Sequence, residues 1–355
     1  MAASDAGTAP SYAGYAVKGQ GQALEPFTYQ PRPLGVTDVE IHIDHCGICA
    51  TDLNTIDNPW GTVHYPVVPG HEIVGRVVAV GSDVRDLQVG QAVGVGPIVL
   101  SCMAKECDAC SRGLEPHCLK VVGTYGYPYP DGEYSQGGYA RAIRVHQHFV
   151  IPIPDGLDPA EAAPLLCAGT TVFVPMHRYK VQPGDHVGVL GIGGLGHLAI
   201  QFARGFGAKV TAITSSSGKR DECLKLGATQ VVCITNKNEV TSLTRSLDYL
   251  VVASSSPHLN WNQLASLMRT FGKIVVVTSS KHKIDILPLS LLRNCVSVVG
   301  SLIGGCDEVA QMLTFAAKHQ IHPWIQKLPM AEVNQGIKLL REGKVRYRLV
   351  LSNDA

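Results

Sequence analysis

Residues 186–206 read HVGVLGIGGLGHLAIQFARGF, and this stretch decides the fold. An apolar strand-like run precedes a GxGxxG pattern, and a helical run follows it. Gly191 would permit a tight turn, Gly193 would let the backbone approach a pyrophosphate, and Gly196 would allow close packing of helix and strand. The helix N-terminus favours negative charge. The flanking elements disfavour the alternative of a merely flexible turn. The predicted dinucleotide-binding residues are Gly191, Gly193, Gly194, Leu195 and Gly196.

The segment after the second strand predicts which dinucleotide binds. A site for NAD usually has an acid at the end of that strand to bind the ribose 2′-hydroxyl. Here strand 208–213 is followed by TSSSGKR, and no acid occurs before Asp221. Hydroxyl groups and cations suit a 2′-phosphate, so the sequence predicts NADP(H) rather than a solvated, helix-capping turn. The predicted contacts are Ser215, Ser216 and Lys219.

Two domains are expected from the length of 355 residues and from a change of pattern along the chain. Residues 1–165 carry short strand-like runs, such as 39–43 and 73–80, separated by Gly, Pro and Asp turns. That pattern is typical of an irregular β-barrel or sandwich. Strands and helices then alternate over 166–305, which predicts a doubly wound parallel sheet. We therefore expect an α/β protein whose first domain is completed by 306–355.

Charge and composition exclude several classes of partner. The net charge is +1, with 30 basic against 29 acidic residues, which gives no electrostatic reason to bind nucleic acid or an anionic membrane. No run of 18 apolar residues predicts a membrane span, and the N-terminus does not resemble a signal peptide. Eleven cysteines, an odd number, favour a reducing compartment. We expect a cytoplasmic protein that acts on a small molecule.

Four cysteines lie close together in residues 102–118, with the spacing C-x4-C-x2-C-x7-C. A tight loop with close cysteine pairs is what a tetrahedral four-thiolate zinc site requires. Basic residues within this four-cysteine run are matched by acidic ones, so a nucleic-acid-binding zinc module is not expected. The predicted structural zinc ligands are Cys102, Cys107, Cys110 and Cys118.

Further potential metal ligands are dispersed along the chain. They lie in the segments 46–52 (CGICATD), 69–72 (PGHE) and 164–170 (PLLCAGT). A catalytic zinc needs about three protein ligands and one open position, which two thiolates and one imidazole supply. From the residues alone, either Cys46 or Cys49 could be the ligand, and Cys167 could be a buried core thiol.

Taken together, these motifs resemble one family. CGICATD, VVPGHEIVG, the four-cysteine run, SQGGYA, APLLCAGTTV, GIGGLGHLA and VRYRLVL occur in the order seen in zinc-dependent medium-chain alcohol dehydrogenases. The resemblance covers nearly the whole chain and is greatest to the NADP(H)-dependent cinnamyl-alcohol-dehydrogenase-like branch, including its fungal members. It implies a GroES-like catalytic domain, a Rossmann domain, two zinc ions per chain, NADP(H), and a homodimer joined through the Rossmann sheets.

Carried over residue by residue, the resemblance implies that Cys49, His71 and Cys167 bind the catalytic zinc. Glu72 matches the neighbouring carboxylate that can enter the coordination sphere. Thr51 matches the hydroxyl that hydrogen-bonds the substrate alkoxide. These five residues form the expected catalytic set.

The same resemblance implies that Cys46 is structural and that Thr171 and Ser301 contact the cofactor. The expected reaction is reduction of an aromatic or medium-chain aldehyde, or its reverse. Zinc would polarise the carbonyl, NADPH would supply the hydride, and the Thr51 hydroxyl would pass the proton. A cofactor-binding protein without catalysis is the less favoured alternative, because the open zinc site is intact.

One departure from the family concerns the proton route. Ala50 and Asn54 stand where the family often has histidines. An asparagine amide cannot ionise near neutral pH, so the proton must leave through the cofactor ribose and water, or through another group. We therefore expect alcohol oxidation to suffer more than carbonyl reduction. The alternative is that the enzyme reduces an iminium or a conjugated C=C bond.

A second departure is the x4 gap after Cys102, where the family usually has x2. Either residues 103–106 bulge outward, or Cys102 drops out and leaves a three-thiolate site. We favour the bulge, because the other three cysteines keep the family spacing. The substrate pocket is weakly specified; its candidate apolar lining is Ile56, Trp60, Leu100 and Tyr125.

Overall fold

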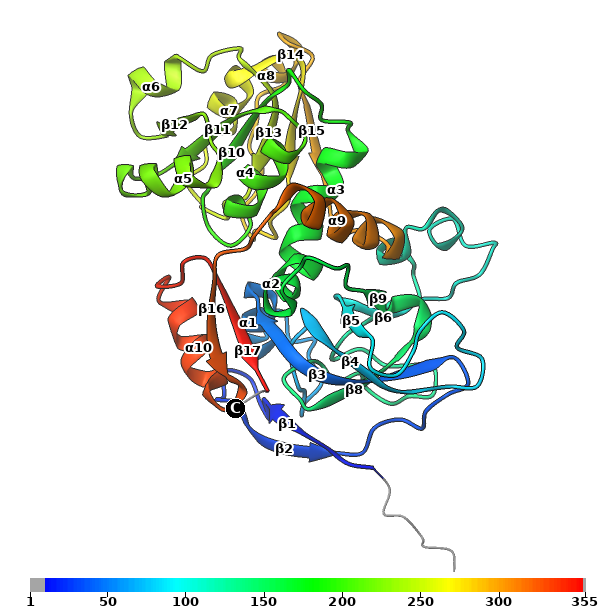
Figure 1. Cartoon of the computed structure of the whole chain (residues 1–355). Helices are drawn as coiled ribbons and strands as arrows, with labels where there is room; N and C mark the ends of the chain where they lie inside the picture. The colour runs from blue at the N-terminus through cyan, green and yellow to red at the C-terminus, as the bar shows by residue number, and fades with distance from the viewer. Residues whose placement is uncertain (1–9, 354–355) are drawn as a thin grey trace, which may run out of the picture. The chain divides into compact units, whose positions relative to one another are not determined.

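The computed structural model describes residues 10–353 and divides the chain into two compact units (Figure 1). The first unit comprises the chain up to Cys167 together with the segment from Ile325 onward, and the second comprises Ala168–Trp324. The first unit is rich in antiparallel strands, and the second alternates strands with helices. The expected α/β class, with a β-rich domain and a doubly wound domain, is confirmed.

A six-stranded parallel sheet forms the centre of the second unit. Its strands are β10 (His186–Leu190), β11 (Lys209–Thr214), β12 (Gln230–Cys233), β13 (Leu247–Val252), β14 (Met268–Val276) and β15 (Ser297–Gly300). Their order is β12-β11-β10-β13-β14-β15, so the sheet grows outward in both directions from β10 and β13. That order is the one found in doubly wound dinucleotide-binding folds. All five residues of β10 are buried, as expected for a central parallel strand.

Helices connect these strands. They are α3 (Thr170–Arg178), α4 (Gly196–Gly205), α5 (Arg220–Leu226), α6 (Lys237–Thr241), α7 (Trp261–Leu267), α8 (Pro288–Leu292) and α9 (Cys306–His319). The turn from β10 to α4 depends on glycine. Gly191 has a φ of 91°, and a Cβ at Gly196 would collide with the carbonyl oxygen of Gly191. Leu195 is the residue that precedes α4.

Helix α9 shifts the boundary between the units. The sequence predicts a return to the first domain at residue 306, whereas the compact second unit continues to Trp324. The reason is packing against α3: the Arg178 guanidinium donates two 2.7 Å hydrogen bonds to Glu308, and the rings of Phe173 and Phe315 lie 5.3 Å apart.

The first unit is built on a seven-stranded sheet in the order β16-β17-β3-β4-β5-β9, with β8 also paired to β3. Its strands are β3 (Asp38–Ile48), β4 (Ile73–Val80), β5 (Ala92–Val95), β8 (Ala142–His146), β9 (Ile151–Pro152), β16 (Ile325–Pro329) and β17 (Arg348–Ser352). Two small antiparallel pairs accompany it: β1 (Tyr12–Ala16) with β2 (Glu25–Tyr29), and β6 (Ile98–Leu100) with β7 (Val122–Gly123). The unit's helices are α1 (Ala50–Asp57), α2 (Pro159–Pro164) and α10 (Val333–Arg341).

Register in this sheet brings distant segments of sequence together. Strands β3 and β4 are antiparallel, with Cys46 opposite Ile73. On the other side of β3, Leu349 of β17 pairs with Ile48. The ends of three strands therefore meet where β3 leads into α1.

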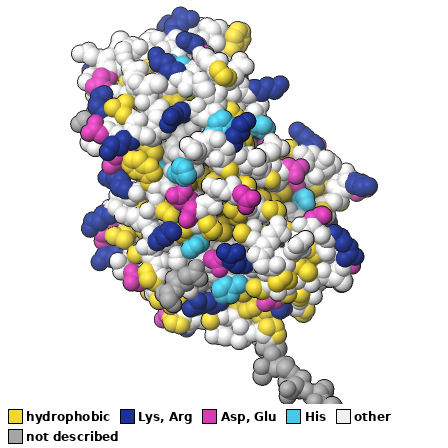
Figure 2. Space-filling model, viewed as in Figure 1, with side chains coloured by type: hydrophobic (Ala, Val, Ile, Leu, Met, Phe, Trp, Pro, Cys, Tyr) yellow, Lys and Arg dark blue, Asp and Glu magenta, His cyan; other side chains and the backbone are white. Residues whose placement is uncertain are grey.

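Basic and acidic side chains are interspersed over the face seen in Figure 2. Within residues 10–353, none of the helices combines the length and the apolar character that crossing a membrane would need.

Candidate active site

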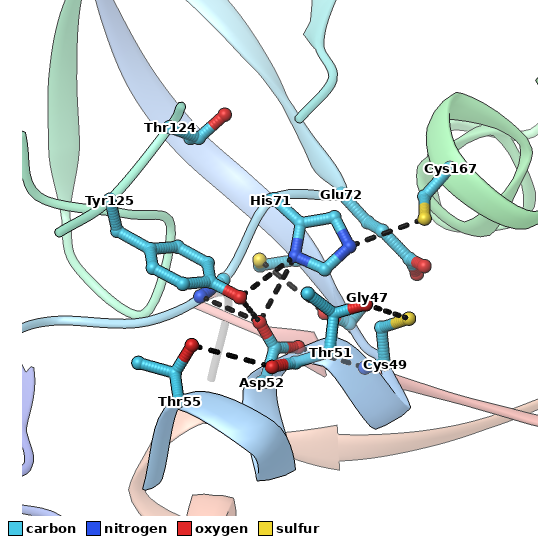
Figure 3. Close-up of polar contacts among 12 residues, drawn as sticks. Gly47, Cys49, Thr51, Asp52, Thr55, His71, Glu72, Thr124, Tyr125 and Cys167 are labelled. Carbon is cyan, nitrogen blue, oxygen red and sulfur yellow. Dashed lines mark hydrogen bonds and ion pairs between the residues drawn. The ribbon is translucent and has the colours of Figure 1, made fainter. Parts of the chain in front are cut away.

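Four potential metal ligands converge in the first unit, at the ends of β3 and β4. Cys49 immediately precedes α1, and His71 and Glu72 immediately precede β4. Cys167 lies in the π-helical turn Leu165–Gly169 that follows α2. One ligand atom from each residue lies within 4.8 Å of all the others (Figure 3). Cys49 is partly exposed and the other three are buried.

This donor set is suited to zinc. Two thiols, an imidazole and a carboxylate are the side chains that bind Zn²⁺ in proteins. His71 Nε2 lies 3.2 Å from Cys167 Sγ, so both atoms face the same point. One carboxylate oxygen of Glu72, Oε2, is buried and has no hydrogen-bond partner. A buried oxygen without a partner is costly unless something else binds it, and a cation among these ligands would do so.

The residue beside the ligands, Asp52, orients His71. Asp52 is fully buried and lies in the first turn of α1. Its Oδ1 lies 3.1 Å from His71 Nδ1, and its Oδ2 accepts a 2.8 Å hydrogen bond from the backbone N–H of Cys49. One carboxylate therefore contacts two neighbouring members of the donor set. A carboxylate that accepts a hydrogen bond from the other ring nitrogen fixes the tautomer and ring orientation of a histidine ligand.

Glu72 is paired with Arg348 of β17, and both side chains are buried. Burial raises the pKa of Glu72 to about 7, although the Arg348 charge opposes that shift. The pKa of Arg348 is raised by Glu72, Cys49 and Cys167 together, which outweigh the effect of its own burial. A permanent cation therefore stands behind the thiols and favours their ionised form.

The thiols themselves differ. Contact with Cys167 lowers the pKa of Cys49 well below the usual value, and His71 lowers it further, against the effect of burial. The same contact, followed by burial, raises the pKa of Cys167. Burial alone would lower the pKa of His71, but Asp52 and Cys49 outweigh it and raise that pKa.

Helix α1 carries the expected proton-handling residues. Thr51 Oγ1 lies 3.7 Å from Cys49 Sγ, and the Thr51 side chain is exposed. Asn54 follows three residues later, so it shares a helix face with Thr51. Thr51 therefore lies at the edge of the donor set.

The four-cysteine run folds into a compact cluster. The Sγ atoms of Cys102 and Cys110 are 3.6 Å apart, those of Cys102 and Cys118 are 3.5 Å apart, and those of Cys107 and Cys118 are 4.0 Å apart. Zinc–sulfur bonds of about 2.3 Å in a tetrahedron would give sulfur–sulfur separations of about 3.8 Å. These separations fit that geometry, and Cys102 takes part despite its widened spacing.

Residues at the carboxyl edge of the parallel sheet form the candidate cofactor site. Ser215 and Ser216 are exposed and directly follow β11. Lys219 Nζ donates a 2.6 Å hydrogen bond to the carbonyl oxygen of Ile192, within the glycine loop. Ser301 directly follows β15, whereas Thr171 is buried in α3.

The four candidate pocket residues do not share one environment. Ile56 is buried in the core, and Trp60 is 57% exposed. Leu100 is only partly buried. Tyr125 is buried, and its hydroxyl donates a 2.7 Å hydrogen bond to Asp52.

Sequence reasoning missed two residues of the site, Asp52 and Arg348. Each stands inside a motif that drew attention for other residues, CGICATD and VRYRLVL. In CGICATD, an acid three residues after the thiol of Cys49 and directly after the hydroxyl of Thr51 could have indicated a partner for the nearby histidine.

Comparison with known proteins agrees with this architecture. Residues 35–155 match the alcohol dehydrogenase GroES-like domain, and residues 194–318 match the zinc-binding dehydrogenase family. Vomilenine reductase of Rauvolfia serpentina is 40% identical over 341 residues, which are 95% of this chain and 94% of that protein.

Two solved structures are also similar. A cinnamyl alcohol dehydrogenase from Sorghum bicolor superimposes with a TM-score of 0.92 at 38% identity, covering 97% of this chain and 98% of that one. A cinnamyl alcohol dehydrogenase from Helicobacter pylori, complexed with NADP(H), gives 0.88 at 31% identity, covering 96% and 98%. The expected likeness to fungal members stays a prediction. The chain belongs to the zinc-dependent medium-chain alcohol dehydrogenases, in their cinnamyl-alcohol-dehydrogenase-like branch, and it is an alcohol dehydrogenase or reductase of that family.

Proposed function

We propose that this protein is an NADP(H)-dependent alcohol dehydrogenase that works mainly as a reductase of aromatic or medium-chain aldehydes. The observation that carries the proposal is the convergence of Cys49, His71 and Cys167 around the unpartnered Oε2 of Glu72. The names of the Sorghum and Helicobacter relatives support an aldehyde or alcohol of the cinnamyl type as substrate.

In this proposal Cys49, His71 and Cys167 hold a catalytic zinc, and Glu72 is the carboxylate that can join them. When bound, the zinc supplies a Lewis acid for the substrate oxygen. Asp52 holds the Nδ1–H of His71, which leaves Nε2 free as the ligand atom. Arg348 holds the second Glu72 oxygen, Oε1, away from the ligands.

The proton is handled at Thr51. Its hydroxyl stands at the edge of the donor set and donates to the oxygen that becomes negative when hydride arrives at the carbonyl carbon. Because Asn54 cannot ionise, the Thr51 hydroxyl would recover its proton from water or, when NADP(H) is bound, from the cofactor ribose. In the oxidation direction the same hydroxyl accepts the proton from the alcohol. Transfer of that proton from Thr51 to solvent is slow, because Asn54 cannot accept it.

The cofactor is proposed to be NADP(H). The glycine loop, Gly191 to Gly196, receives the pyrophosphate, and Ser215, Ser216 and Lys219 receive the 2′-phosphate. Support comes from the absence of an acid before Asp221 and from the contact of Lys219 with the loop. Thr171 and Ser301 are proposed as further cofactor contacts.

A second zinc is proposed in the four-cysteine run, with Cys102, Cys107, Cys110 and Cys118 as ligands. The backbone N–H of Lys120 donates to Cys118 Sγ at 3.3 Å, and the thiol of Cys110 lies 3.4 Å from Ser101 Oγ. Such hydrogen bonds stabilise thiolates. This site has no open position for substrate, so its role is structural.

We also propose a homodimer formed through the second unit, in the cytoplasm. Strand β15 is the edge of the parallel sheet, and an unprotected edge can pair with another chain. Beside it in sequence, α8 exposes Leu289 and Leu292 by 56% and 70%, and Leu287 precedes the helix with 62% exposure. Exposed leucines next to an open edge are suited to burial against a second copy.

The second candidate function is reduction of an iminium or conjugated C=C bond with the same zinc site. Asn54 favours it, because such a reduction makes less demand on a histidine relay. Vomilenine reductase, at 40% identity, is named as a reductase and not as an alcohol dehydrogenase.

The deciding experiment measures NADPH and NADH consumption by the purified protein with three substrate panels: aromatic and medium-chain aldehydes, iminium ions, and enals. The expected result is aldehyde reduction with NADPH that disappears after complete metal removal and returns when zinc is added. Aldehyde turnover that survives complete loss of zinc would overturn the mechanism. Turnover of iminium ions or enals without aldehyde turnover would establish the second function.

A further inference from the structure

We propose that Tyr125 is a positioning residue for the metal centre: its hydroxyl, hydrogen-bonded to Asp52 and in contact with His71, holds the Asp52–His71 pair in the arrangement in which His71 presents Nε2 to the metal. The proposal rests on the zinc site proposed above and goes beyond it, because it adds a residue outside the expected ligand set and gives it a defined role.

The position of Tyr125 is fixed by its neighbours along the chain. Tyr125 lies in the loop after β7, where the backbone N–H of Thr124 bonds to the carbonyl oxygen of Pro97 at 3.0 Å. On the other side, Gly126 bonds to Ser135 at 2.8 Å. The phenol is thereby held inside the unit, with its ring 5.8 Å from that of His71 (Figure 3).

Three polar atoms meet at the end of the Tyr125 side chain. Tyr125 Oη lies 2.7 Å from Asp52 Oδ1 and 3.3 Å from His71 Nδ1. Asp52 Oδ1 also lies 3.1 Å from His71 Nδ1. All three side chains are buried.

Counting hydrogens in this triangle assigns the tautomer. A carboxylate can only accept, so the single hydroxyl hydrogen of Tyr125 points to Asp52 Oδ1. The Tyr125 oxygen then offers only its lone pairs to His71 Nδ1, as Asp52 does. Nδ1 therefore carries the ring hydrogen, and Nε2, 3.2 Å from Cys167 Sγ, keeps the lone pair that a metal needs.

Tyr139 provides a matched comparison. It is also buried and donates a 2.8 Å hydrogen bond to Asp52, but to the other oxygen, Oδ2. Oδ2 additionally accepts from the backbone of Cys49 and has no contact with His71 among the described hydrogen bonds. Loss of the Tyr139 hydroxyl removes one bond to Asp52 and leaves the triangle with His71 intact.

The test compares Tyr125→Phe and Tyr139→Phe with the wild-type full-length protein, loaded with zinc. The first readout is the rate at which each of the two expected zinc ions passes to a colorimetric chelator. The second is the visible absorption spectrum after cobalt replaces the catalytic zinc. Cys49→Ser identifies which release phase belongs to the catalytic site.

We expect Tyr125→Phe to release the catalytic zinc about tenfold faster and to shift the cobalt bands, because loss of a residue that orients a metal ligand typically weakens metal binding at least that much. Release from the four-cysteine run should not change. Tyr139→Phe should stay within about threefold of wild type in both readouts. Equal release rates for wild type and Tyr125→Phe, or for the two variants, would overturn the inference.

Two further results keep the test decisive. If Tyr125→Phe does not fold, long-range proton–nitrogen NMR of ¹⁵N-histidine-labelled wild type decides, with the His71 signal identified by its loss in His71→Gln. A hydrogen on Nδ1 supports the inference, and a hydrogen on Nε2 overturns it. If wild type and Cys49→Ser bind the same amount of zinc, no zinc occupies the proposed catalytic site. That result would refute the proposed function and this inference together. Unchanged release in Tyr125→Phe, with that zinc present in wild type, would refute the inference alone.

Discussion

The sulfur of Cys102 lies 3.6 Å from that of Cys110, although four residues rather than two separate Cys102 from Cys107. The extra length is taken up by Met103, whose φ of 47° turns the backbone into the left-handed region and leaves its side chain exposed. The Cys102 sulfur thus lies in the same cluster as the other three, which fits an outward bulge of residues 103–106, and its role as a zinc ligand stays a prediction.

Cys102→Ser is therefore expected to reduce bound zinc from two ions to one per chain and to lower the melting temperature, because a structural zinc contributes directly to folding. Metal analysis and thermal unfolding measure both effects. Met103→Ala, in the bulge, should leave both unchanged. Full zinc content in Cys102→Ser would show that three thiolates suffice.

Gly193→Ala should weaken cofactor binding without loss of stability. A Cβ at Gly193 meets no atom within 4 Å, so the fold has room for it, but the space is where the pyrophosphate is proposed to lie. Fluorescence titration with NADPH should give a Kd at least about tenfold higher. Gly196→Ala should instead lower the melting temperature, since its Cβ collides with the Gly191 carbonyl. Normal NADPH affinity in Gly193→Ala would place the cofactor elsewhere.

Lys219→Ala should reduce the preference for NADPH over NADH. The Lys219 ammonium sits against the glycine loop through Ile192, and only NADPH carries the 2′-phosphate that it would bind. We expect kcat/KM to fall about tenfold with NADPH and much less with NADH. Lys225→Ala is the matched control, because Lys225 is an exposed lysine on α5, the helix that Lys219 precedes. Equal losses with both cofactors would contradict the assignment.

Asn54→His should raise alcohol oxidation more than aldehyde reduction. A histidine one turn after Thr51 would accept the proton that the asparagine amide cannot, and general-base assistance commonly contributes at least about a hundredfold. The gain should appear above about pH 6.5, where an ordinary imidazole is neutral. In Thr51→Val/Asn54→His the gain should vanish. No gain in oxidation at any pH would disprove this relay.

His186 should make the protein sensitive to mild acid. Its Nδ1 donates to the carbonyl oxygen of Ser246 at 3.0 Å, and its Nε2 accepts from Thr211 Oγ1 at 2.8 Å. Burial, followed by the charge of Lys209, lowers the pKa of His186. The unfolded chain then binds the proton more readily than the folded one below about pH 6.5. The contribution of His186 to the free energy of unfolding is therefore fully present above that pH and is lost as the pH falls.

His186→Gln should accordingly lose less stability than wild type between about pH 7.5 and about pH 5.5. Urea midpoints at the two pH values measure the difference, and the comparison cancels the contribution of His146, whose pKa is also lowered by burial. If the urea midpoint falls by the same amount in wild type and His186→Gln, His186 has no role in the acid sensitivity.

Local sequence patterns predicted the buried strands and the glycine turn, because these elements depend mainly on residues that are close in sequence. Strand-like runs at 73–80 and 186–190 correspond to β4 and β10, and the GxGxxG context predicted the turn into α4. Apolar runs bounded by turn residues specify a buried strand wherever the partner strands lie. Ligand residue types were likewise visible, because few residues bind zinc.

Long-range pairing was not visible in the same way. The partner of Glu72 is Arg348, 276 residues later, and no periodicity connects two such positions. Asp52 was overlooked because its role depends on the register that places His71 beside α1. Helix α9 shows the same limit: residues 306–355 are expected from sequence to complete the first domain, whereas packing on α3 places α9 in the compact second unit.

Strand β17 lies inside the first sheet, between β16 and β3, and this placement has a consequence for biosynthesis. The ribosome must make all of Ala168–Trp324 before it makes the strand that completes the sheet begun at β3. Until β17 is made, Glu72 lacks the Arg348 guanidinium with which it is paired in the folded protein. The unit whose translation starts first is thus the one whose folding finishes last.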